Sequence, residues 1–308
     1  MSVKHVAVEV PASSANLGPG FDALAAALDV PLVVETIDRQ AQRVVAEGLG
    51  AGELPTDDGN LIWRGVLGYC NRFGVEVPDV SVRADNAIPL ERGMGSSAAA
   101  AVAGVTLARA LVGLGSDAEL IDLAAELEGH PDNAAAALLG GIVVCAEGLA
   151  RRLEPAGTLR PVICIPDTRQ STTAARGVLP DSVSLADAAA NGARTAMLLA
   201  GLSGALAWEP AVMRDVLHEP SRFGVMPETG RVVSALRDQG IGACLSGAGP
   251  SVLAVVGGDD DDAIAAIRHA AGSGWEVRPV GWHRRGASKV SSTDADAGQP
   301  AQATADNG

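Results

Sequence analysis

Apolar and polar residues alternate or cluster in short runs along the first half of the chain, which predicts strands mixed with helices. The alternation from His5 to Val10 predicts a strand, and the prolines and glycines of the following segment PASSANLGPGFD predict a break in it. Further strands are predicted at residues 32–37, 43–46, 80–84, 142–146 and 162–165. Helices are predicted at residues 60–73, 96–112, 117–127 and from Pro131 to the glycine pair 140–141.

The second half of the chain alternates helical and strand-like segments. Helices are predicted near residues 172–178, 184–207, 209–217 and 229–239. Strands are predicted at residues 243–246, 252–256 and 276–279. This mixture predicts an α+β chain whose halves join around residues 154–159. Residues 285–308 contain almost no large apolar side chain, and we expect this tail to be disordered.

Composition and charge exclude several classes of function. The formal net charge of −14 argues against binding to nucleic acid or to an anionic membrane. The apolar stretch at residues 134–146 is too short and too broken by glycine to span a bilayer. The N-terminal segment lacks the pattern of a signal peptide, so we expect a cytoplasmic protein. Cys70, Cys145, Cys164 and Cys244 lie far apart, which favours buried thiols over a zinc site or disulfides.

Lysine is rare in this chain. Lys4 and Lys289 are its two lysines, and the rest of its 23 lysine and arginine residues are arginine. High genomic GC content and adaptation to high salt would both explain this composition. Because no lysine lies near a glycine-rich segment, a bound phosphate would be held by backbone N–H groups, hydroxyls, arginine or a metal ion.

Three glycine-rich loops carry the candidate chemistry. The segment PLERGMGSSAAAAV, residues 89–102, leads from a predicted strand into a predicted helix, whose unpaired N–H groups and dipole attract an anion. It is neither a Walker A sequence nor a dinucleotide fingerprint, and alone it fits a structural turn equally well. Residues 13–22 (SSANLGPGFD) and 245–254 (LSGAGPSVLA) are similar loops, although the latter alone would also fit a β-turn. Together they predict a cleft walled by backbone and suited to a phosphate and a small polar substrate.

Four segments, in this order along the chain, resemble the motifs of a known family: PASSANLGPGFDALAAAL, PLERGMGSSAAAAVAG, EGHPDNAAAALLGG and LSGAGPSVLAVV. The family is that of the homoserine kinases, within the superfamily of galactokinase, homoserine kinase, mevalonate kinase and phosphomevalonate kinase (GHMP kinases). The resemblance covers residues 5–282. The glycine-serine loop is specific to the superfamily, and SANLGPGFD together with EGHPDN is specific to homoserine kinases.

This resemblance implies an α+β fold of two lobes with the active site between them. Residues 1–155 would form an N-terminal ATP-binding lobe like domain 2 of ribosomal protein S5, and residues 156–284 a ferredoxin-like C-terminal lobe. It also implies the reaction, in which ATP phosphorylates the side-chain hydroxyl of L-homoserine during threonine biosynthesis. ATP and Mg²⁺ are the expected cosubstrate and cofactor, and a homodimer is a further expectation.

The resemblance assigns the nucleotide site to the glycine-serine loop. Ser96 or Ser97 would complete the coordination of Mg²⁺, with Ser97 as the preferred ligand, and Glu128 would be its carboxylate ligand, as suits a cation that prefers oxygen. Asn60 and Trp63 are candidates for the adenine pocket. The residues that would wrap the phosphates of ATP are Pro89, Leu90, Glu91, Arg92, Gly93, Met94, Gly95, Ser96, Ser97, Ala98 and Ala99.

Homoserine carries a carboxylate, an ammonium group and a hydroxyl, so its pocket needs cationic, anionic and neutral groups together. Arg176 and Arg222 lie in segments that resemble those of the carboxylate clamp, although either one alone would more commonly be a solvated surface residue. Asp22 would pair with the ammonium group, and Asn16, His130 and Asn133 would hold the hydroxyl end. Gly247 and Gly249 would line the cleft near phosphates and substrate.

Asp132 is the candidate general base of the reaction, because HPDN places it beside His130 and Asn133. Phosphoryl transfer often passes through a loose transition state, however, and the proton would otherwise pass directly to a phosphate oxygen. His130 would alternatively only pack its loop. A kinase for mevalonate, shikimate or a sugar, a non-catalytic module that senses ATP or amino acids, and an unrelated α/β domain with coincidental glycine loops are the rival interpretations.

Overall fold

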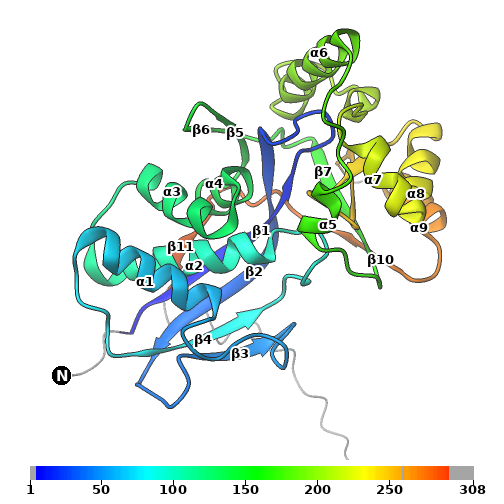
Figure 1. Ribbon diagram of the computed structural model, residues 1–308. Helices are drawn as coiled ribbons and strands as arrows, with labels where there is room; N and C mark the ends of the chain where they lie inside the picture. The colour runs from blue at the N-terminus through cyan, green and yellow to red at the C-terminus, as the bar shows by residue number, and fades with distance from the viewer. Residues whose placement is uncertain (1–4, 259, 291–308) are drawn as a thin grey trace, which may run out of the picture.

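The protein folds into two lobes that lie side by side, each built on its own β-sheet (Figure 1). The computed structural model describes residues 5–258 and 260–290. Strands of the first sheet come from residues 7–153 and 288–290, and strands of the second sheet come from residues 159–279. The predicted α+β fold of two lobes is therefore confirmed.

The first lobe contains a seven-stranded sheet with the order β11-β1-β2-β4-β3, and β5 joins it by pairing with β2 and β6. These pairs are antiparallel, except that β3 runs parallel to β4. The β1–β2 pair carries its connecting loop, residues 16–23, to the boundary with the second lobe. The strands are β1 (Ala7–Ala15), β2 (Leu24–Ile37), β3 (Val44–Gly48), β4 (Ser81–Asn86), β5 (Ile142–Ala146), β6 (Leu149–Leu153) and β11 (Ser288–Val290).

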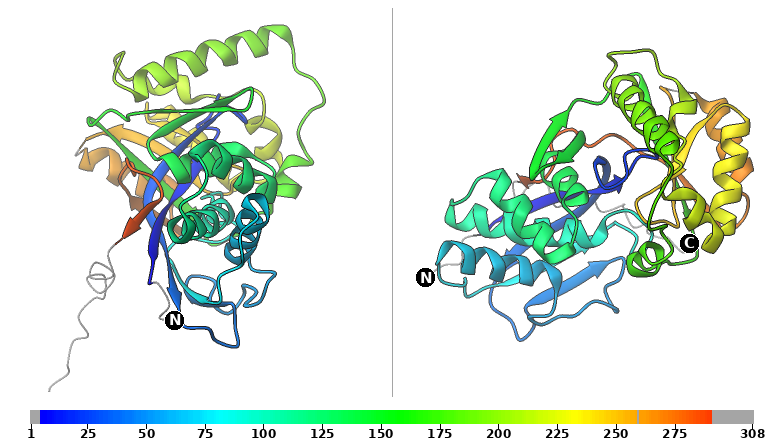
Figure 2. Two further views of the ribbon diagram at one scale, coloured as in Figure 1. Left: turned by 90° about the vertical axis from the view of Figure 1, so that its left-hand side faces the viewer. Right: turned by 45° about the horizontal axis from the view of Figure 1, so that its top comes forward.

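Four helices cover one face of this sheet (Figures 1 and 2): α1 (Leu61–Phe73), α2 (Ser96–Val112), α3 (Asp117–Glu128) and α4 (Pro131–Leu139). Helix α2 is buried along most of its length, because its alanines let the other three helices pack closely around it. Asn60 caps α1 by accepting a hydrogen bond from the N–H of Ile62 at 2.9 Å, as its sequence position predicts. No helix in the described parts of the chain is long and apolar enough to cross a membrane.

The second lobe contains a four-stranded antiparallel sheet with the order β10-β7-β9-β8. Its strands are β7 (Leu159–Pro166), β8 (Gly242–Leu245), β9 (Val252–Gly257) and β10 (Trp275–Pro279). Helices α8 (Pro227–Asp238) and α9 (Asp261–Ala271) pack on this sheet around a core of aliphatic side chains, although no helix was predicted at α9. The remaining helices are α5 (Thr172–Arg176), α6 (Leu185–Leu202), the 3₁₀ helix η1 (Pro210–Met213) and α7 (Glu219–Val225).

Strand β1 continues five residues past the predicted end at Val10. The register shifts at a bulge between Pro11 and Ala12, where Pro11 lies opposite Pro31. A bulge tolerates proline because the strand needs no N–H donor at that point, so the strand does not end there. The predicted break was therefore wrong, and the extra length brings Ser13 and Ser14 to the lobe boundary.

Residues 209–217 do not form the predicted helix. The 3₁₀ helix η1 ends at Met213, and Oδ2 of Asp215 then accepts hydrogen bonds from the N–H groups of residues 217–219 at 3.0, 2.7 and 2.8 Å. A side chain that captures these N–H groups stops one helix and starts the next. The prediction was wrong here, and Arg222 lies on the separate helix α7 that follows.

The end of the chain is more ordered than predicted. Residues 285–290 belong to the fold, since β11 pairs antiparallel with β1 and places Val290 opposite Ala7. The N–H of Ala287 also donates to the carbonyl oxygen of Ala137 at 2.8 Å. The prediction of a disordered tail was therefore wrong for residues 285–290, and the rest of that tail, residues 291–308, lies outside the described residues.

The four cysteines are buried thiols, as the sequence predicts. Burial raises the pKa of Cys145 to about 11 and the pKa of Cys164 to about 12. A thiol reacts as its thiolate, so these two side chains are inert near neutral pH.

Candidate active site

Close contacts that only glycine permits hold the loop between β4 and α2. Gly93 and Gly95 have φ angles of 70° and 65°. A Cβ atom on Gly95 would lie 2.2 Å from Oγ of Ser13, and one on Gly93 would lie 2.2 Å from the carbonyl oxygen of Ser246. The loop therefore packs directly on β1 and on the turn after β8, which places the start of α2 at the boundary between the lobes.

A cavity of about 360 Å³ opens beside this loop, and we call it the central cleft. Glu128 lines it from the end of α3, His130 and Asn133 line it from the start of α4, and Gly247 lines it from the turn after β8. The loop residues that line it are Pro89, Glu91, Arg92, Gly93, Met94, Gly95, Ser96, Ser97 and Ala98. Leu90 faces a neighbouring cavity instead, and Ala99 is fully buried in α2. Three of the four sequence motifs thus contribute to the wall of one cleft.

Ser97 and Glu128 place a hydroxyl and a carboxylate side by side at the start of α2. The Ser97 hydroxyl donates a hydrogen bond to Oε1 of Glu128 at 2.6 Å. Burial raises the pKa of the Glu128 carboxyl, and this hydrogen bond opposes the rise. No cluster of three or more His, Cys, Asp or Glu side chains suited to a metal occurs among the described residues. The pair fits Mg²⁺, which binds few protein oxygens and completes its shell with water and phosphate oxygens.

Asn133 and Asp132, adjacent in sequence, have different surroundings. Oδ1 of Asn133 accepts a hydrogen bond from the hydroxyl of Ser13 at 2.9 Å, which fixes the start of α4 on β1. Asp132 is 3% exposed, and its Oδ1 accepts the N–H of Asn133 at 2.7 Å. Burial raises the pKa of the Asp132 carboxyl, and the negative charge of Asp22 adds to the rise. Asp132 is therefore a buried carboxyl with raised proton affinity, and it does not line the central cleft.

Asp22 and Arg176 form a bidentate ion pair between the two lobes. Arg176 donates to Oδ1 of Asp22 at 2.8 Å and to Oδ2 at 3.2 Å, and it also donates to Nδ1 of His130 at 3.4 Å. The N–H of Asp22 donates to Oδ1 of Asn16 at 3.1 Å, and Nδ2 of Asn16 donates to the carbonyl oxygen of Gly247 at 2.9 Å. Asn16 is 4% exposed, and its amide joins the loop after β1 to the turn after β8.

Gly249 faces away from the central cleft, in contrast to Gly247. A Cβ atom on Gly249 would lie 2.8 Å from the sulfur of Met226 and 2.9 Å from a methyl carbon of Leu245. Gly249 is therefore packed against the interior of the second lobe, where a larger residue would not fit. Its predicted position beside the substrate remains a prediction.

Arg222 is a buried guanidinium, with only 2% of its surface exposed. Its Nε donates to the carbonyl oxygen of Ala175 at 3.3 Å, and its NH1 donates to Nδ1 of His218 at 3.1 Å and to the carbonyl oxygen of Gly247 at 3.2 Å. No carboxylate in the described part of the chain forms an ion pair with it. The alternative of a solvated surface arginine is therefore wrong for this residue.

The two arginines expected to bind a carboxylate meet over one aromatic ring. The guanidinium carbons of Arg176 and Arg222 lie 5.7 and 5.5 Å from the ring centroid of Phe21. Burial lowers the pKa of Arg222, and the positive charge of Arg176 lowers it further. The carboxylates of Asp22, Asp215 and Glu219 act on this pKa in the opposite direction. None of them forms an ion pair with Arg222 among the described residues, so its guanidinium can bind a further anion.

Comparison with known proteins gives matches along nearly the whole chain. Residues 60–141 match the family model for the GHMP kinases N terminal domain, and residues 188–277 match the model for GHMP kinases C terminal. The homoserine kinase of Streptomyces coelicolor is 41% identical over 292 residues, which cover 92% of this chain and 93% of that protein. The chain belongs to the homoserine kinase family of the GHMP kinases.

Further relatives agree with this assignment. The homoserine kinase of Mycolicibacterium smegmatis is 44% identical over 264 residues, covering 79% of this chain and 82% of that protein. The crystal structure of homoserine kinase from Cytophaga hutchinsonii has a TM-score of 0.81 at 28% identity, covering 94% of this chain and 99% of that one. The GHMP kinase fold expected from the sequence motifs is confirmed.

In this member of the homoserine kinase family, a second cavity of about 390 Å³ adjoins the central cleft, and we call it the apolar cavity. Glu91, Ser96 and Ser97 line both cavities. Asn60 lines the apolar cavity while it caps α1, but Trp63 is fully buried and does not line it. Nine of its 19 lining residues are aliphatic: Leu32, Val44, Ala46, Leu54, Leu61, Ile62, Ala84, Leu90 and Ala100.

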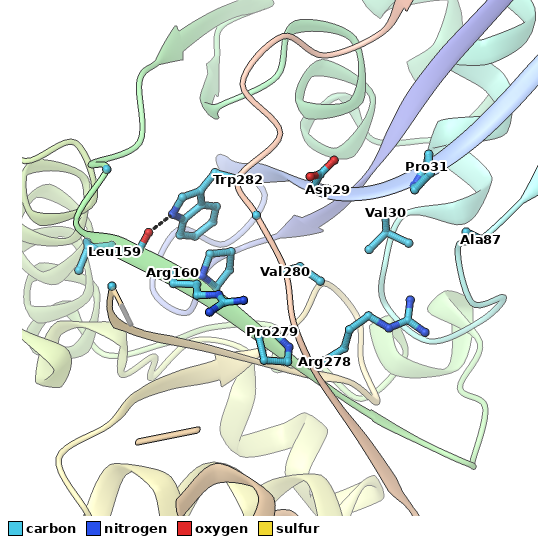
Figure 3. A pocket seen from close by; sticks show the side chains of 14 residues that line it. Asp29, Val30, Pro31, Ala87, Leu159, Arg160, Arg278, Pro279, Val280 and Trp282 are labelled. Atoms are coloured by element: carbon cyan, nitrogen blue, oxygen red, sulfur yellow. Dashed lines mark hydrogen bonds between the residues drawn. The ribbon is translucent and has the colours of Figure 1, made fainter. Parts of the chain in front are cut away.

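A hollow of about 520 Å³ lies at another junction of the two lobes, away from the predicted site residues (Figure 3). Its charged side chains include Asp29 and Arg278. Arg278 pairs with Glu276 at 2.7 Å, and Oδ1 of Asp29 lies 3.3 Å from Nδ1 of His283. The indole N–H of Trp282 donates to the carbonyl oxygen of Leu159 at 2.9 Å and joins the lobes there. The hollow contains none of the predicted site residues, and its contacts connect the two sheets.

Several residues around the site were not predicted from the sequence. Gln170, Ser171 and Thr172 line the central cleft, and Ser171 also caps α5 by accepting from the N–H of residue 174 at 3.2 Å. Phe21 contacts both Arg176 and Arg222, and His218 contacts Arg222. His218 had a signal in the sequence, since it begins the segment HEPSRFG that contains Arg222.

Proposed function

We propose that the central cleft transfers the γ-phosphoryl group of ATP to the side-chain hydroxyl of L-homoserine, giving ADP and O-phospho-L-homoserine. The chain is a homoserine-phosphorylating kinase of threonine biosynthesis, and ATP is its second substrate. The observation that carries the substrate assignment is Arg222, a buried guanidinium with no carboxylate partner among the described residues, close to Arg176.

The substrate is held at both charged ends. The α-carboxylate binds Arg222 and Arg176, because a buried cation is stabilised by an anion that replaces its lost hydration. The α-ammonium group binds the carboxylate of Asp22. This assignment leaves the hydroxyl end directed toward His130 and Asn133, which line the central cleft.

ATP spans the two adjoining cavities. Its phosphates lie along the glycine-serine loop, where the positive φ angles at Gly93 and Gly95 and the first N–H groups of α2 provide an anion site. Its adenine and ribose occupy the apolar cavity, whose aliphatic lining suits a flat, largely apolar base. Ser96 and Ser97, which line both cavities, lie where the phosphates meet the nucleoside.

Ser97 and Glu128 hold Mg²⁺ in this proposal. When bound, Mg²⁺ neutralises negative charge on the transferring phosphate. The protein contributes a hydroxyl and a carboxylate already placed 2.6 Å apart on α2 and α3.

The protein accelerates the reaction mainly by orientation and charge. The site holds the hydroxyl in line with the γ-phosphorus, and the start of α2 stabilises the charge that develops on the phosphoryl oxygens. The proton of the hydroxyl passes to a phosphate oxygen or to Asp132, although the side chain of Asp132 does not line the central cleft. Burial raises the pKa of Asp132 and increases its affinity for that proton, but the carboxyl must be ionised to act as a base.

A test of this function compares homoserine with two analogues that each lack one charged group. The purified chain, ATP and Mg²⁺ are combined with L-homoserine, 3-aminopropan-1-ol, which lacks the carboxylate, or 4-hydroxybutanoate, which lacks the ammonium group, and ADP release is measured. We expect roughly a 10- to 100-fold higher kcat/KM for homoserine than for either analogue. Equal rates with homoserine and with 3-aminopropan-1-ol would refute the assignment of Arg176 and Arg222 to the carboxylate. Turnover with mevalonate or galactose and none with homoserine would refute the proposed substrate.

A further inference from the structure

His218 lies behind Arg222 and is fully buried. It immediately precedes α7, and Arg222 follows it by four residues, about one helical turn later. Its ring stacks on Phe21 with 5.1 Å between the ring centroids, and the guanidinium of Arg222 lies over the same ring. Histidine, phenylalanine and arginine thus form one packed cluster beside the proposed carboxylate site.

The hydrogen bonds of His218 permit one tautomer. Arginine has no acceptor, so NH1 of Arg222, 3.1 Å away, donates to the lone pair of Nδ1. The carbonyl oxygen of Gly18 has no donor, so Nε2, 3.0 Å away, carries the proton. A protonated imidazole would direct an N–H group at the N–H of Arg222. The neutral tautomer with hydrogen on Nε2 satisfies both contacts.

The surroundings of His218 fix both its position and its charge. Oδ2 of Asp215 accepts the N–H groups of His218 and Glu219 at 2.7 and 2.8 Å, which sets the backbone at the start of α7. Burial lowers the pKa of His218 to about 4. The carboxylate of Asp215, whose Oδ2 lies 3.7 Å from Nε2, opposes this shift, and the positive charge of Arg222 adds to it. The ring is therefore neutral near pH 7 and accepts the hydrogen bond from Arg222.

The protein uses only part of the Arg222 guanidinium. Nε and NH1 donate to protein acceptors, while NH2 has no acceptor among the described residues. We propose that His218 is a positioning residue that holds the guanidinium so that its NH2 side binds the α-carboxylate of homoserine. This inference rests on the proposed function, since it gives Arg222 the orientation that the carboxylate clamp requires.

Two substitutions of equal severity separate positioning from packing. In His218→Asn, the side-chain oxygen occupies the place of Nδ1 and accepts from Arg222, but the bond to Gly18 is lost. In His218→Gln, the side-chain amide reaches the place of Nε2 and donates to Gly18, but the acceptor for Arg222 is lost. Both variants replace the ring that stacks on Phe21, so they disturb the packing to a similar extent.

For each variant we would measure the KM for L-homoserine and compare its change with the changes in the KM for ATP and the KM for 3-aminopropan-1-ol. We expect His218→Gln to raise the KM for homoserine roughly 10-fold or more, with much smaller changes in the other two constants. His218→Asn should stay within about threefold of the wild type on all three. Equal KM values for homoserine in both variants, or an equal rise for homoserine and 3-aminopropan-1-ol, would overturn the positioning role.

A measurement on the wild-type protein keeps the inference testable if a variant does not fold. In a ¹⁵N NMR spectrum of labelled histidine, we expect the fully buried ring of His218 to remain neutral between pH 7 and about 5, which identifies its resonances. We expect its Nε2 to be protonated and its Nδ1 resonance to shift on addition of L-homoserine but not of 3-aminopropan-1-ol. A proton on Nδ1 would overturn the proposal. If homoserine is not a substrate at all, the proposed function fails, whichever tautomer is observed.

Discussion

The guanidinium of Arg176 holds the carboxylate of Asp22 with two hydrogen bonds, at 2.8 and 3.2 Å, although the two residues lie 154 positions apart in the chain. Each is proposed to bind the opposite charge on homoserine, so the arriving zwitterion replaces each partner with an equivalent one. Both side chains are well exposed, at 38% and 40%, and an exposed pair contributes about 0–1 kcal/mol. The ion pair between Asp22 and Arg176 is thus weak enough for homoserine to displace it.

Replacing Asp22 by asparagine should weaken homoserine binding more than it weakens the fold. We expect roughly a 10-fold rise in the KM for L-homoserine, because the ammonium group loses a charged partner, and less than about 1 kcal/mol of lost stability. Steady-state kinetics and urea unfolding measure the two effects. Asp79→Asn is the control, since Asp79 pairs with Arg39 far from the cleft at 3.8 Å. An equal loss with 4-hydroxybutanoate, which has no ammonium group, would contradict the assignment.

Alanine at Gly95 should damage the site far more than alanine at Gly113. The two glycines flank α2 with φ angles of 65° and 89°, so both substitutions strain the backbone. A Cβ at Gly95 would meet Oγ of Ser13 at 2.2 Å, whereas nothing lies within 4 Å of a Cβ at Gly113. We expect Gly113→Ala to cost about 1 kcal/mol of stability and to retain activity.

We expect Gly95→Ala to lose at least about 10-fold in kcat/KM. Urea unfolding and ADP release, measured on both variants, test this difference. Similar activity in the two proteins would mean that the contact of the loop with β1 does not shape the phosphate site.

Glu128→Gln should raise the Mg²⁺ concentration needed for half-maximal activity roughly 10-fold, because an amide is a weaker ligand for a hard cation than a carboxylate. Ser97→Ala should act in the same direction with a smaller effect. Glu126→Gln is the matched control on the same helix, since Glu126 pairs with Arg72 on the outer surface at 2.7 Å. Titration of Mg²⁺ at saturating ATP gives the concentration at half-maximal activity for each variant. If this concentration were unchanged in Glu128→Gln, Glu128 would not be a ligand of Mg²⁺.

His218 should make the protein less stable in acid. Its pKa falls from an ordinary value of 6.5 to about 4 on folding, so the unfolded chain takes up a proton first as the pH drops. The contribution of His218 is therefore fully present above about pH 6.5 and is lost progressively down to about pH 4, a loss of about 3 kcal/mol.

His218→Asn cannot titrate at this position, so its free energy of unfolding should fall less over the same interval. Urea unfolding of both proteins between about pH 7 and 4.5 gives the difference, in which the carboxyl groups common to both cancel. Parallel curves for the two proteins would mean that the ring is charged in the folded state.

Local signals predicted much of this fold, and contacts between distant residues account for what was missed. Asn60 caps α1 and the paired glycines 140–141 end α4, because such caps depend on a few neighbouring residues. The continuation of β1 past Pro11 depends on β2, and the break after Met213 depends on the side chain of Asp215. Neither is encoded in a short window of sequence.

The same distinction between local signals and contacts of distant residues holds for the candidate site. All the predicted residues of the glycine-serine loop except Leu90 and Ala99 line one cleft with Glu128 and His130, because their motifs specify a local loop conformation. The apolar cavity and the stacking of His218 on Phe21 arise only when separate elements come together. The expected homodimer, the cytoplasmic location and the domain boundary near residue 155 remain predictions, since none of them follows from these contacts.

The pairing of β11 with β1 has a consequence for synthesis on the ribosome. Val290 lies opposite Ala7, so the edge strand of the first sheet waits for a partner that is translated 283 residues later. At roughly 5–20 residues per second, that edge stays open for about 15 to 60 s. During this interval β1 exposes unpaired N–H and carbonyl groups that other nascent chains can bind. The nascent enzyme thus carries an unprotected sheet edge until residues 288–290 have been synthesised and pair with β1.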